Sequence, residues 1–529
     1  MSAPDGDHGE TQDGVVRATG AIGLATLISR VLGFIRDVVV ARAFGAGLAT
    51  DAFFVAFRIP NLLRRLLAEG ALAPAFVPVF AEYLSTRPRG EFLRMVRSVA
   101  TAFFFILCLV SLLGILLAPW IVSLMAPGFA SIPQKAELAA RLTRLMFPYL
   151  VFVGLAALAM GVLNVHRRFF APALGPVALN LGMIASVMFL VPRLDAPITG
   201  LAVGVLVGGL GQFLLQLPEL RRAGVSLAPS AKLFHPALAR IAALLGPSVL
   251  GLASVQLAVF VNTFLASLLP DGSISYLYYA DRVMEFPLGV FGVAVATATL
   301  PPMAEQAARR DLRRLGETLN FALRLSCFVA VPASVGLLLL RNPIVRVLFE
   351  RGEFRGADTQ ATAFALGFYA LGLTAFSAVR IAAQAFYALG DVKTPVRVGI
   401  LSVLLNVALA LALMWPLAHG GLALASSCAS TFNLLFLLRR LKPRLGSLGG
   451  RALLRSLWKT GAGSGCLAVW CGLILWLWPE SPSRLTDAGV LAAAIGGGAI
   501  LYAGVSALLR GEEGFALFSL VRRGKGSLP

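Results

Sequence analysis

Long apolar segments separated by short polar ones dominate the chain from residue 18 onwards. A helix needs about twenty mostly apolar residues to cross a bilayer. By this criterion we predict fourteen transmembrane helices at 18–44, 50–83, 96–125, 140–165, 172–191, 196–218, 240–269, 274–302, 318–340, 360–388, 396–416, 420–438, 456–478 and 486–509. The second segment is too long for one simple span, and Pro60, Gly70, Pro74 and Pro78 predict that it is kinked or interrupted.

The composition supports a membrane location. Of the 529 residues, 58% are hydrophobic and only 14% are charged, and the mean hydropathy is +0.82. A soluble protein of this length would expose far more charge, so we predict an all-α polytopic membrane protein. The formal net charge of +20 would indicate nucleic acid in a soluble protein. Here basic loops that set topology explain it, and no nucleic-acid partner is expected.

The basic residues alternate between the two sets of loops. One set holds 27 of them, at 87–97, 167–168, 221–240, 309–314, 393–397, 439–459 and 510–525. The opposite set holds only Lys135, Arg193, Arg341, Arg346, Arg351, Arg355 and Arg484. Because basic loops stay in the cytoplasm, this asymmetry places both termini there and requires an even number of spans.

The two ends of the chain and the cysteines add little chemistry. Residues 1–17 are polar and acidic without the features of a signal peptide, so we predict a disordered cytoplasmic tail, and a second cytoplasmic tail at 511–529. The five cysteines are scattered without a CxxC pair, and no metal site is expected. Walker A, HExxH and GxSxG motifs are absent, which leaves ATP hydrolysis by that route and the common hydrolase chemistries unsupported.

An internal repeat divides the chain. PVFAE at 78–82 matches PPMAE at 301–305, an offset of 223 residues that we call the repeat offset. Ala171-Pro172 matches Thr394-Pro395 at the same offset, and GLAVG at 200 matches GLALA at 421 at an offset of 221. These matches predict two homologous lobes of six helices, at 18–225 and 236–445, facing a central cavity. Residues 450–510 then form two additional helices outside the repeat.

Charged residues lie inside these apolar segments. Arg30 is near the middle of the first span, where a charge costs a few kcal/mol even on insertion scales, about 2.5–3.5. Arg36 and Asp37 follow it. In the second span Asp51, Arg58 and Arg65 are seven residues apart and therefore share a helix face. Such charges persist where they face a polar cavity or a partner.

The second half contains a corresponding group. The repeat offset brings Arg58 onto Asp281, next to Arg282, with Tyr278 four residues before and Glu285 three residues after Arg282. Alternatives remain open for part of these charges. Arg64 and Arg65 can act as interfacial anchors, and the acidic residues can simply neutralise neighbouring arginines.

The sign of the charge favours an anionic substrate. Arginine stays ionised and binds phosphate through two parallel hydrogen bonds, so several guanidinium groups in a low-dielectric cavity suit a diphosphate. An exporter of cationic drugs needs intramembrane carboxylates without compensating arginines.

The same segments resemble a known family. SRVLGFIRD (29–37), FGAGLATDAFFVAFRIPNLLRRLLAEGA (44–71), FVPVFAEY (76–83) and YYADRVMEFPLGVFGVA (278–294) are similar to the bacterial MurJ (MviN) family of the multidrug/oligosaccharidyl-lipid/polysaccharide exporter superfamily. The resemblance implies fourteen helices in two six-helix lobes, with the two extra helices forming a groove for a lipid tail. The family's essential arginines match Arg30, Arg36, Arg64, Arg65 and Arg282, and its acidic positions match Asp37, Asp51 and Glu69.

The resemblance implies a lipid II flippase of the bacterial inner membrane rather than an enzyme. Its substrate would be undecaprenyl-diphosphate-MurNAc-pentapeptide-GlcNAc, with membrane lipids and the cell-wall synthesis machinery as further partners. Some family members place an acidic sodium ligand on the seventh helix, where this chain offers Asn262 and no carboxylate, so the sequence does not support that sodium site. Membrane potential and an ion gradient both stay open as the energy source, and no cofactor is predicted. The alternatives are an exporter of another lipid-linked saccharide or small molecule, and a membrane scaffold for cell-wall enzymes.

Overall fold

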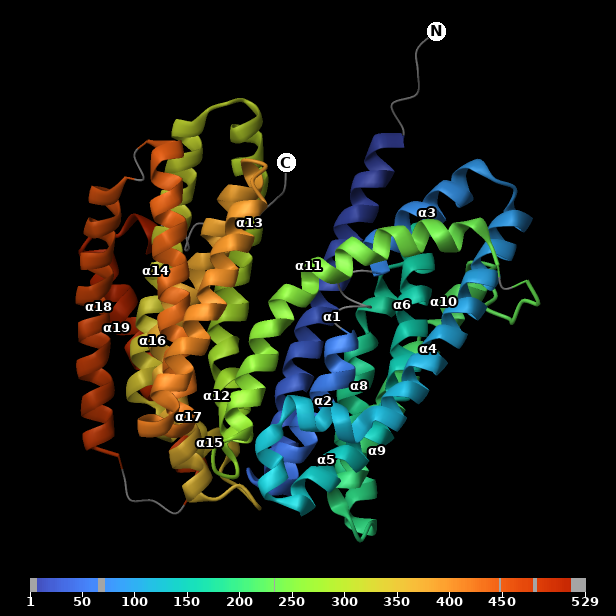
Figure 1. Cartoon of the computed structure of the whole chain (residues 1–529). Helices are drawn as coiled ribbons and strands as arrows, with labels where there is room; N and C mark the ends of the chain where they lie inside the picture. Colours follow the sequence, from blue (N-terminus) through green and yellow to red (C-terminus); the bar gives the residue numbers. More distant parts are fainter. Residues whose placement is uncertain (1–6, 65–71, 233, 447–448, 479–482, 515–529) are drawn as a thin grey trace. The chain divides into compact units, whose positions relative to one another are not determined.

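The computed structural model describes residues 7–64, 72–232, 234–446, 449–478 and 483–514, and every regular element in these ranges is a helix (Figure 1). The all-helical prediction is therefore confirmed. The chain divides into two compact units, residues 1–272 and 273–529.

The first unit begins with α1 and ends with α11. In chain order its helices are α1 (Asp7–Phe44), α2 (Leu48–Arg64), α3 (Leu72–Thr86), α4 (Arg89–Met125), η2 (Pro127–Ser131), α5 (Pro133–Met146), α6 (Tyr149–Val165), α7 (Phe170–Ala173), α8 (Gly175–Ala185), η3 (Ser186–Leu190), η4 (Val191–Arg193), α9 (Pro197–Leu214), α10 (Leu217–Arg222) and α11 (Pro236–Ser267).

The second unit begins at α12. Its helices are α12 (Ser273–Pro287), η5 (Leu288–Gly292), α13 (Val293–Ala308), α14 (Leu312–Leu339), α15 (Arg341–Phe349), α16 (Gly356–Ala388), α17 (Lys393–Leu445), α18 (Gly450–Trp476) and α19 (Arg484–Leu508). Within this unit α18 packs on α14 and on α19 (Figure 1).

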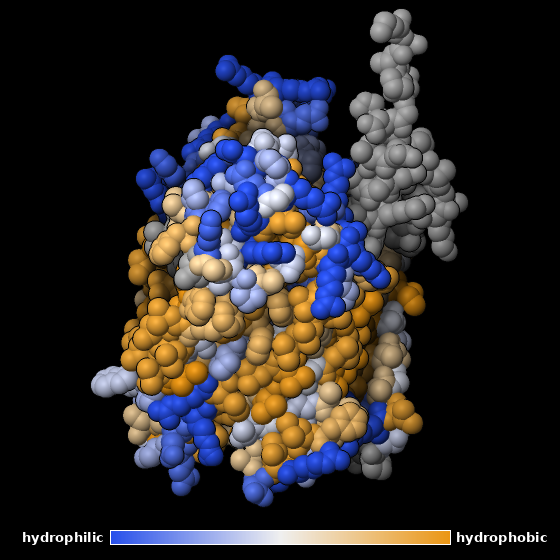
Figure 2. Space-filling model, turned by 90° about the vertical axis from the view of Figure 1, so that its right-hand side faces the viewer, coloured by the Kyte–Doolittle hydropathy of each residue, from blue (hydrophilic) through white to orange (hydrophobic). Residues whose placement is uncertain are grey.

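Much of the surface is apolar, as a bilayer requires. Along α4 the exposed side chains include Phe105, Leu109, Leu116 and Trp120, which is 77% exposed. Figure 2 shows a broad hydrophobic band between two hydrophilic zones. Among the described residues, eight helical segments are long and apolar enough to cross a membrane.

The helix bounds follow the predicted segments, and one break lies inside a segment that was predicted to be continuous. The segment 140–165 is covered by α5 and α6, which meet at Pro148. The segments at 396–416 and 420–438 are covered by α17, which is broken at Ala418, where φ is 46°. The interrupted segment 50–83 is covered by α2 and α3, with 65–71 outside the described residues.

Local sequence explains where several helices begin. Asp311 precedes α14 and accepts a hydrogen bond from the backbone N–H of Arg314 at 3.0 Å. Asp358 in the first turn of α16 accepts from the N–H of Arg355 at 2.9 Å. The first helix starts at Asp7, inside the tail predicted at 1–17. No proline interrupts residues 7–44, which favours one continuous helix.

Close glycine packing joins α8 to α9. A Cβ atom on Gly182 would lie 2.7 Å from Cα of Gly208, and one on Gly208 would lie 2.8 Å from Cα of Leu179. Small residues let two membrane helices approach until their backbones touch. This contact fixes α8, which supplies a residue of the candidate site.

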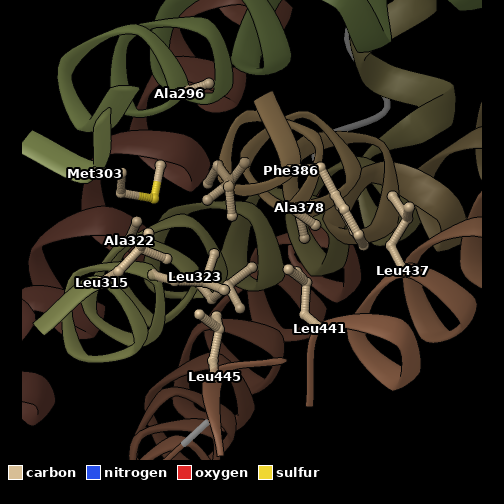
Figure 3. Packing of buried hydrophobic residues seen from close by; sticks show 14 of the residues in the cluster. Ala296, Met303, Leu315, Ala322, Leu323, Ala378, Phe386, Leu437, Leu441 and Leu445 are labelled. Atoms are coloured by element: carbon tan, nitrogen blue, oxygen red, sulfur yellow. The ribbon is translucent and has the colours of Figure 1, made fainter. Parts of the chain in front are cut away.

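The second unit has its own hydrophobic core. Figure 3 shows side chains from four helices pointing toward one another, among them Met303 from α13, Leu323 from α14, Phe386 from α16 and Leu441 from α17. Phe386 and Met303 are fully buried. The core holds these helices together within the unit.

The repeat is visible in the positions of the helices. Helices α4 and α14 begin at Arg89 and Leu312, and α5 and α16 begin at Pro133 and Gly356, so both pairs are separated by the repeat offset. The predicted lobes assign α11 to the second half, whereas α11 packs on α3, α4 and η2 within the first unit. The lobes follow sequence repetition and the units follow packing, so the two divisions differ by this helix.

Candidate functional site

Arg36 lies in a buried polar cluster between α1 and α8. Its Nε and Nη2 donate to Oδ1 of Asp37 at 3.0 and 2.6 Å, and its Nη1 donates to Oδ1 of Asn180 at 3.1 Å. Asn180 in turn donates Nδ2 to the backbone carbonyl of Ser29 at 3.1 Å. Arg36 is 6% exposed and Asp37 2% exposed. The cluster therefore links two helices through a neutralised arginine.

Each member of this cluster needs the others. A buried charge is tolerated when it is paired and hydrogen-bonded, and removing one partner of such a pair costs about 3–5 kcal/mol. Asp37 supplies the balancing charge, and Asn180 supplies a neutral acceptor for the third guanidinium nitrogen. The arginine is therefore oriented by a carboxylate on its own helix and by an amide on a neighbouring one.

Arg30 has a different environment. It lies on α1, six residues before Arg36, and its side chain is exposed. Within the described ranges, no hydrogen bond or ion pair of Arg30 is found. The structure therefore does not pair Arg30 with Asp37, although seven-residue spacing puts them on one face of α1.

The charges of α2 have separate partners. Arg58 donates Nη1 to the hydroxyl of Thr263 on α11. Arg64 donates Nε to Oδ1 of Asn61 at 3.0 Å. Arg65 and Glu69, which the sequence also assigns to the site, lie outside the described residues.

Asp51 belongs to a second buried cluster. Its Oδ2 accepts from Nζ of Lys135 and from the backbone N–H of Gly272, each at 2.8 Å. Lys135 also donates to Oδ1 of Asp271 at 2.6 Å, and its ammonium group lies 4.5 Å from the ring centroid of Phe129. This network ties α2 to α5 and to the chain that follows α11. Its geometry is that of a structural anchor.

In the second unit, Arg282 is more open. It donates Nη1 to Glu285 at 2.9 Å and Nη2 to the hydroxyl of Tyr278 at 3.4 Å. The side chains of Arg282 and Glu285 are 32% and 48% exposed, so this ion pair is solvent-accessible and weak. Asp281 is partly buried beside it. Arg282 can therefore exchange Glu285 for another anion at little cost.

Two residues that the sequence analysis did not select complete these clusters. Asn180 is the only amide side chain in the predicted segment 172–191, and this isolated polar residue was the available signal for it. Lys135 was counted only among the sparse basic residues of the second set of loops, yet it is 3% exposed. The surrounding sequence PGFASIPQK has no feature that predicts burial of this lysine.

A metal-binding role finds no support in the residues that the structure describes. They contain no group of three or more His, Cys, Asp or Glu side chains able to hold a metal ion. Asn262 on α11 has a buried Oδ1 without a hydrogen-bond partner in this part of the chain, which is too little for an ion site.

Comparisons with known proteins agree with the fold and the charged segments. A family model described as lipid II flippase MurJ matches residues 40–483. The chain is 40% identical to lipid II flippase MurJ of Burkholderia cenocepacia, over 79% of this chain and 82% of that protein. It is 39% identical to a probable lipid II flippase MurJ of Vibrio cholerae, over 79% and 81%.

Solved structures show the same architecture. Lipid II flippase MurJ in an inward closed conformation aligns with a TM-score of 0.77 and 27% identity, covering 92% of this chain and 98% of that one. An inward-facing multidrug resistance MATE transporter of the MOP superfamily aligns over 78% and 95% with a TM-score of 0.64 and 16% identity, which shows the fold alone. The chain is a multi-pass membrane protein, and it belongs to the lipid II flippase MurJ family.

Proposed function

We propose that this chain is a lipid II flippase that moves the undecaprenyl-diphosphate-linked precursor from the inner to the outer leaflet of the bacterial inner membrane. Family membership supports a transporter rather than an enzyme. The structural observation that carries the proposal is Arg36, a buried cation held in place by Asp37 and Asn180.

In the proposed mechanism the diphosphate competes with carboxylates for arginines. Arg30, which is exposed, offers the first contact. A phosphate oxygen then takes the place of Asp37 on Arg36, and Arg282 exchanges Glu285 for the substrate. When the substrate leaves, Asp37 and Glu285 return to the arginines. Arg64 and Arg65 would add positive charge to the proposed central cavity.

In the proposed architecture fourteen transmembrane helices include two six-helix lobes. Movement of the lobes opens a central cavity alternately to the two sides of the membrane. The common spacing of the helix starts in the two halves supports two lobes. On α18 and α19 the exposed apolar side chains, including Val469, Trp476 and Ile500, supply a surface suited to the polyprenyl tail. The charge asymmetry of the loops supports cytoplasmic termini. Membrane potential supplies about 2.3 kcal/mol per charge per 100 mV.

A complementation experiment tests the arginine-centred site. Arg36→Ala and Arg282→Ala are expressed at wild-type level in cells depleted of their own flippase, and both are expected to lose growth. Arg313→Ala is the control, because Arg313 lies at the start of α14 with a side chain 89% exposed. Full rescue by both site variants would contradict the proposal.

A binding experiment separates the proposal from its alternatives. Native mass spectrometry of the purified chain is expected to show lipid II retained by the wild type and by Arg313→Ala, and lost from Arg282→Ala. Retention of a different lipid-linked saccharide in place of lipid II would indicate an exporter of that lipid. Normal lipid II transport by all arginine variants, with growth lost only on loop mutation, would indicate a scaffold.

A further inference from the structure

A pocket of about 440 Å³ opens in the first unit, at the turn between α6 and α7. It is separate from the clusters around Arg36 and Asp51. Its walls combine positive charge with apolar surface, from Arg167, Arg168, Phe170, Leu174, Leu215 and Glu219. These residues lie in the turns after α6 and α9 and on or next to α7 and α10, and Arg167 and Arg168 closely follow a segment that is long and apolar enough to cross a membrane. Such a lining suits a molecule with an anionic group on a hydrocarbon body.

Arg167 occupies a backbone position that normally belongs to glycine. Its φ is +57°, in the left-handed region, where the chain leaves α6. The backbone N–H groups of Arg167 and Arg168 donate to the carbonyls of Asn164 and Leu163 at 3.0 and 2.9 Å, as in a helix C-cap. Glycine would adopt this backbone conformation with less strain, so Arg167→Gly removes the charge through a substitution that the backbone favours.

The second half of the chain shows the turn in its unstrained form. The repeat offset brings Arg167 onto Gly390, which has a φ of +73°. The N–H of Gly390 donates to the carbonyl of Tyr387 at 3.0 Å, and that of Asp391 donates to Phe386 at 2.9 Å. The same C-cap is therefore built with glycine in one half and with arginine in the other.

The next residue reverses its charge between the halves. In the first, Arg168 forms an ion pair with Glu219 at 2.5 Å. In the second, Asp391 at the equivalent position forms one with Arg444 at 2.7 Å. In the first half Glu219 also contacts Arg222 at 2.5 Å, and Arg167 stands where the second half has Gly390. Two arginines thus share one carboxylate, and Arg167 adds a further positive charge to the pocket wall.

We propose that this pocket binds the headgroup of an anionic glycerophospholipid in the cytoplasmic leaflet. Arg167 and Arg168 bind the phosphodiester, while the first part of the acyl chains lies against Phe170, Leu174 and Leu215. Phe170 is 54% exposed and extends the apolar surface toward the lipid. Basic pockets between helices at the cytoplasmic side of a membrane bind anionic headgroups in this way. The leaflet rests on the proposed topology, whereas the site does not depend on lipid II transport.

Native mass spectrometry of the full chain tests this site with three probes: phosphatidylglycerol, phosphatidylcholine and inorganic phosphate. Arg167→Gly removes the charge and installs the residue that Gly390 already shows to fit. We expect it to lower the affinity for phosphatidylglycerol by roughly fivefold, the effect of one basic residue near an anionic surface. Arg310→Gly is the matched control, because Arg310 also has a φ of +57° at a helix end but lies outside the pocket.

A second variant acts in the opposite direction. Glu219→Gln releases Arg168 and Arg222 and is expected to raise the affinity for phosphatidylglycerol while leaving that for phosphatidylcholine unchanged. Equal losses in Arg167→Gly and Arg310→Gly would show general surface attraction and overturn the site. So would an unchanged affinity in Arg167→Gly, a loss on Glu219→Gln, or displacement of the lipid by inorganic phosphate at equal concentration.

Discussion

At the scale of single residues, the most deeply buried charges of the site are in ion pairs, whereas other charges are exposed to solvent or lipid. Arg36 and Asp51 are both almost fully buried, and each has an oppositely charged partner within 2.8 Å. Arg30 and Arg282 are accessible. The buried charges are already neutralised by a neighbouring partner, whereas the accessible ones can also reach groups outside the protein, so mutants of the two kinds have different expected costs.

The Asp51–Lys135 pair should behave as a structural anchor. Lys135→Met takes this cation away from Asp51 and Asp271, so we expect a loss of about 3 kcal/mol of stability, the cost of breaking a buried ion pair. The double variant Lys135→Met with Asp51→Leu should lose less than the sum of the single losses. Thermal unfolding in detergent measures this. Additive losses would show that the 2.8 Å contact contributes no coupling.

Arg36 and Asp37 give a second expectation at this scale. Asp37→Asn keeps the shape of the side chain but takes the adjacent negative charge away from the buried Arg36, so stability should fall by about 3 kcal/mol. In the proposed mechanism, bound substrate replaces the missing carboxylate. Thermal unfolding with and without lipid II should therefore show a larger stabilisation by lipid II in Asp37→Asn than in the wild type. An equal or smaller stabilisation would argue against competition between Asp37 and the substrate.

At the scale of helices, the site depends on packing between elements that are themselves apolar. Asn180 reaches Arg36 only because α8 is held against α9, where Gly182 and Gly208 allow backbone contact. The same arrangement explains why a helix without charge contributes to the charged site. Substitutions on α9, remote from any arginine, should therefore affect function.

Two glycines of α9 provide a matched pair. A Cβ on Gly208 would meet Cα of Leu179 at 2.8 Å, whereas one on Gly211 would meet only Cβ of Ala178 at 3.5 Å, an ordinary contact. Gly208→Ala should cost about 1–3 kcal/mol through overpacking and weaken complementation. Gly211→Ala should be neutral or slightly stabilising. Similar behaviour of the two variants would show that the α8–α9 contact does not position Asn180.

The turn before α17 gives a pH-dependent expectation. Hydrogen bonds from the hydroxyl and N–H of Thr394, together with Arg444, lower the pKa of Asp391 to about 2. Because the folded pKa lies below the ordinary value of about 3.9, this stabilisation is complete above that pH and lost as the pH falls toward 2. Asp391→Asn should flatten the pH dependence of thermal unfolding in this range. An unchanged slope would contradict it.

The helices were easier to predict from the sequence than the contacts of the site. Runs of apolar residues gave α4, α9, α16 and α19 almost directly, because length and hydropathy decide insertion. The gap between the segments 396–416 and 420–438 predicts the break at Ala418, whereas the break at Pro148 lies inside the single predicted segment 140–165. Arg36 and Asp37 are adjacent in the sequence, but only the structure shows that the Asp37 carboxylate binds this arginine while Arg30 is exposed.

At the scale of the whole molecule, the repeat is preserved in helix positions while its charges diverge. The repeat offset relates α4 to α14 and α5 to α16, yet it also relates Arg168 to Asp391 and Arg58 to Asp281. A duplicated scaffold thus holds two halves with different electrostatic roles. The chain shares its fold with a MATE transporter at 16% identity, and substrate class does not follow from a shared fold.

The orientation of the chain in the membrane follows from the same loop charges and can be measured directly. Cysteines are placed singly at Ala231, in the basic loop before α11, and at Glu353, in the loop before α16, after the five native cysteines are replaced. Both positions are exposed, so neither label is blocked by packing. If basic loops face the cytoplasm, a membrane-impermeant maleimide should label Glu353→Cys in intact spheroplasts and Ala231→Cys only after permeabilisation. The reverse pattern would invert the topology and move the Arg167 pocket to the outer leaflet. Labelling of both in intact cells would mean that the two loops lie on the same side of the membrane. That result would contradict the three spans predicted between them, at 240–269, 274–302 and 318–340.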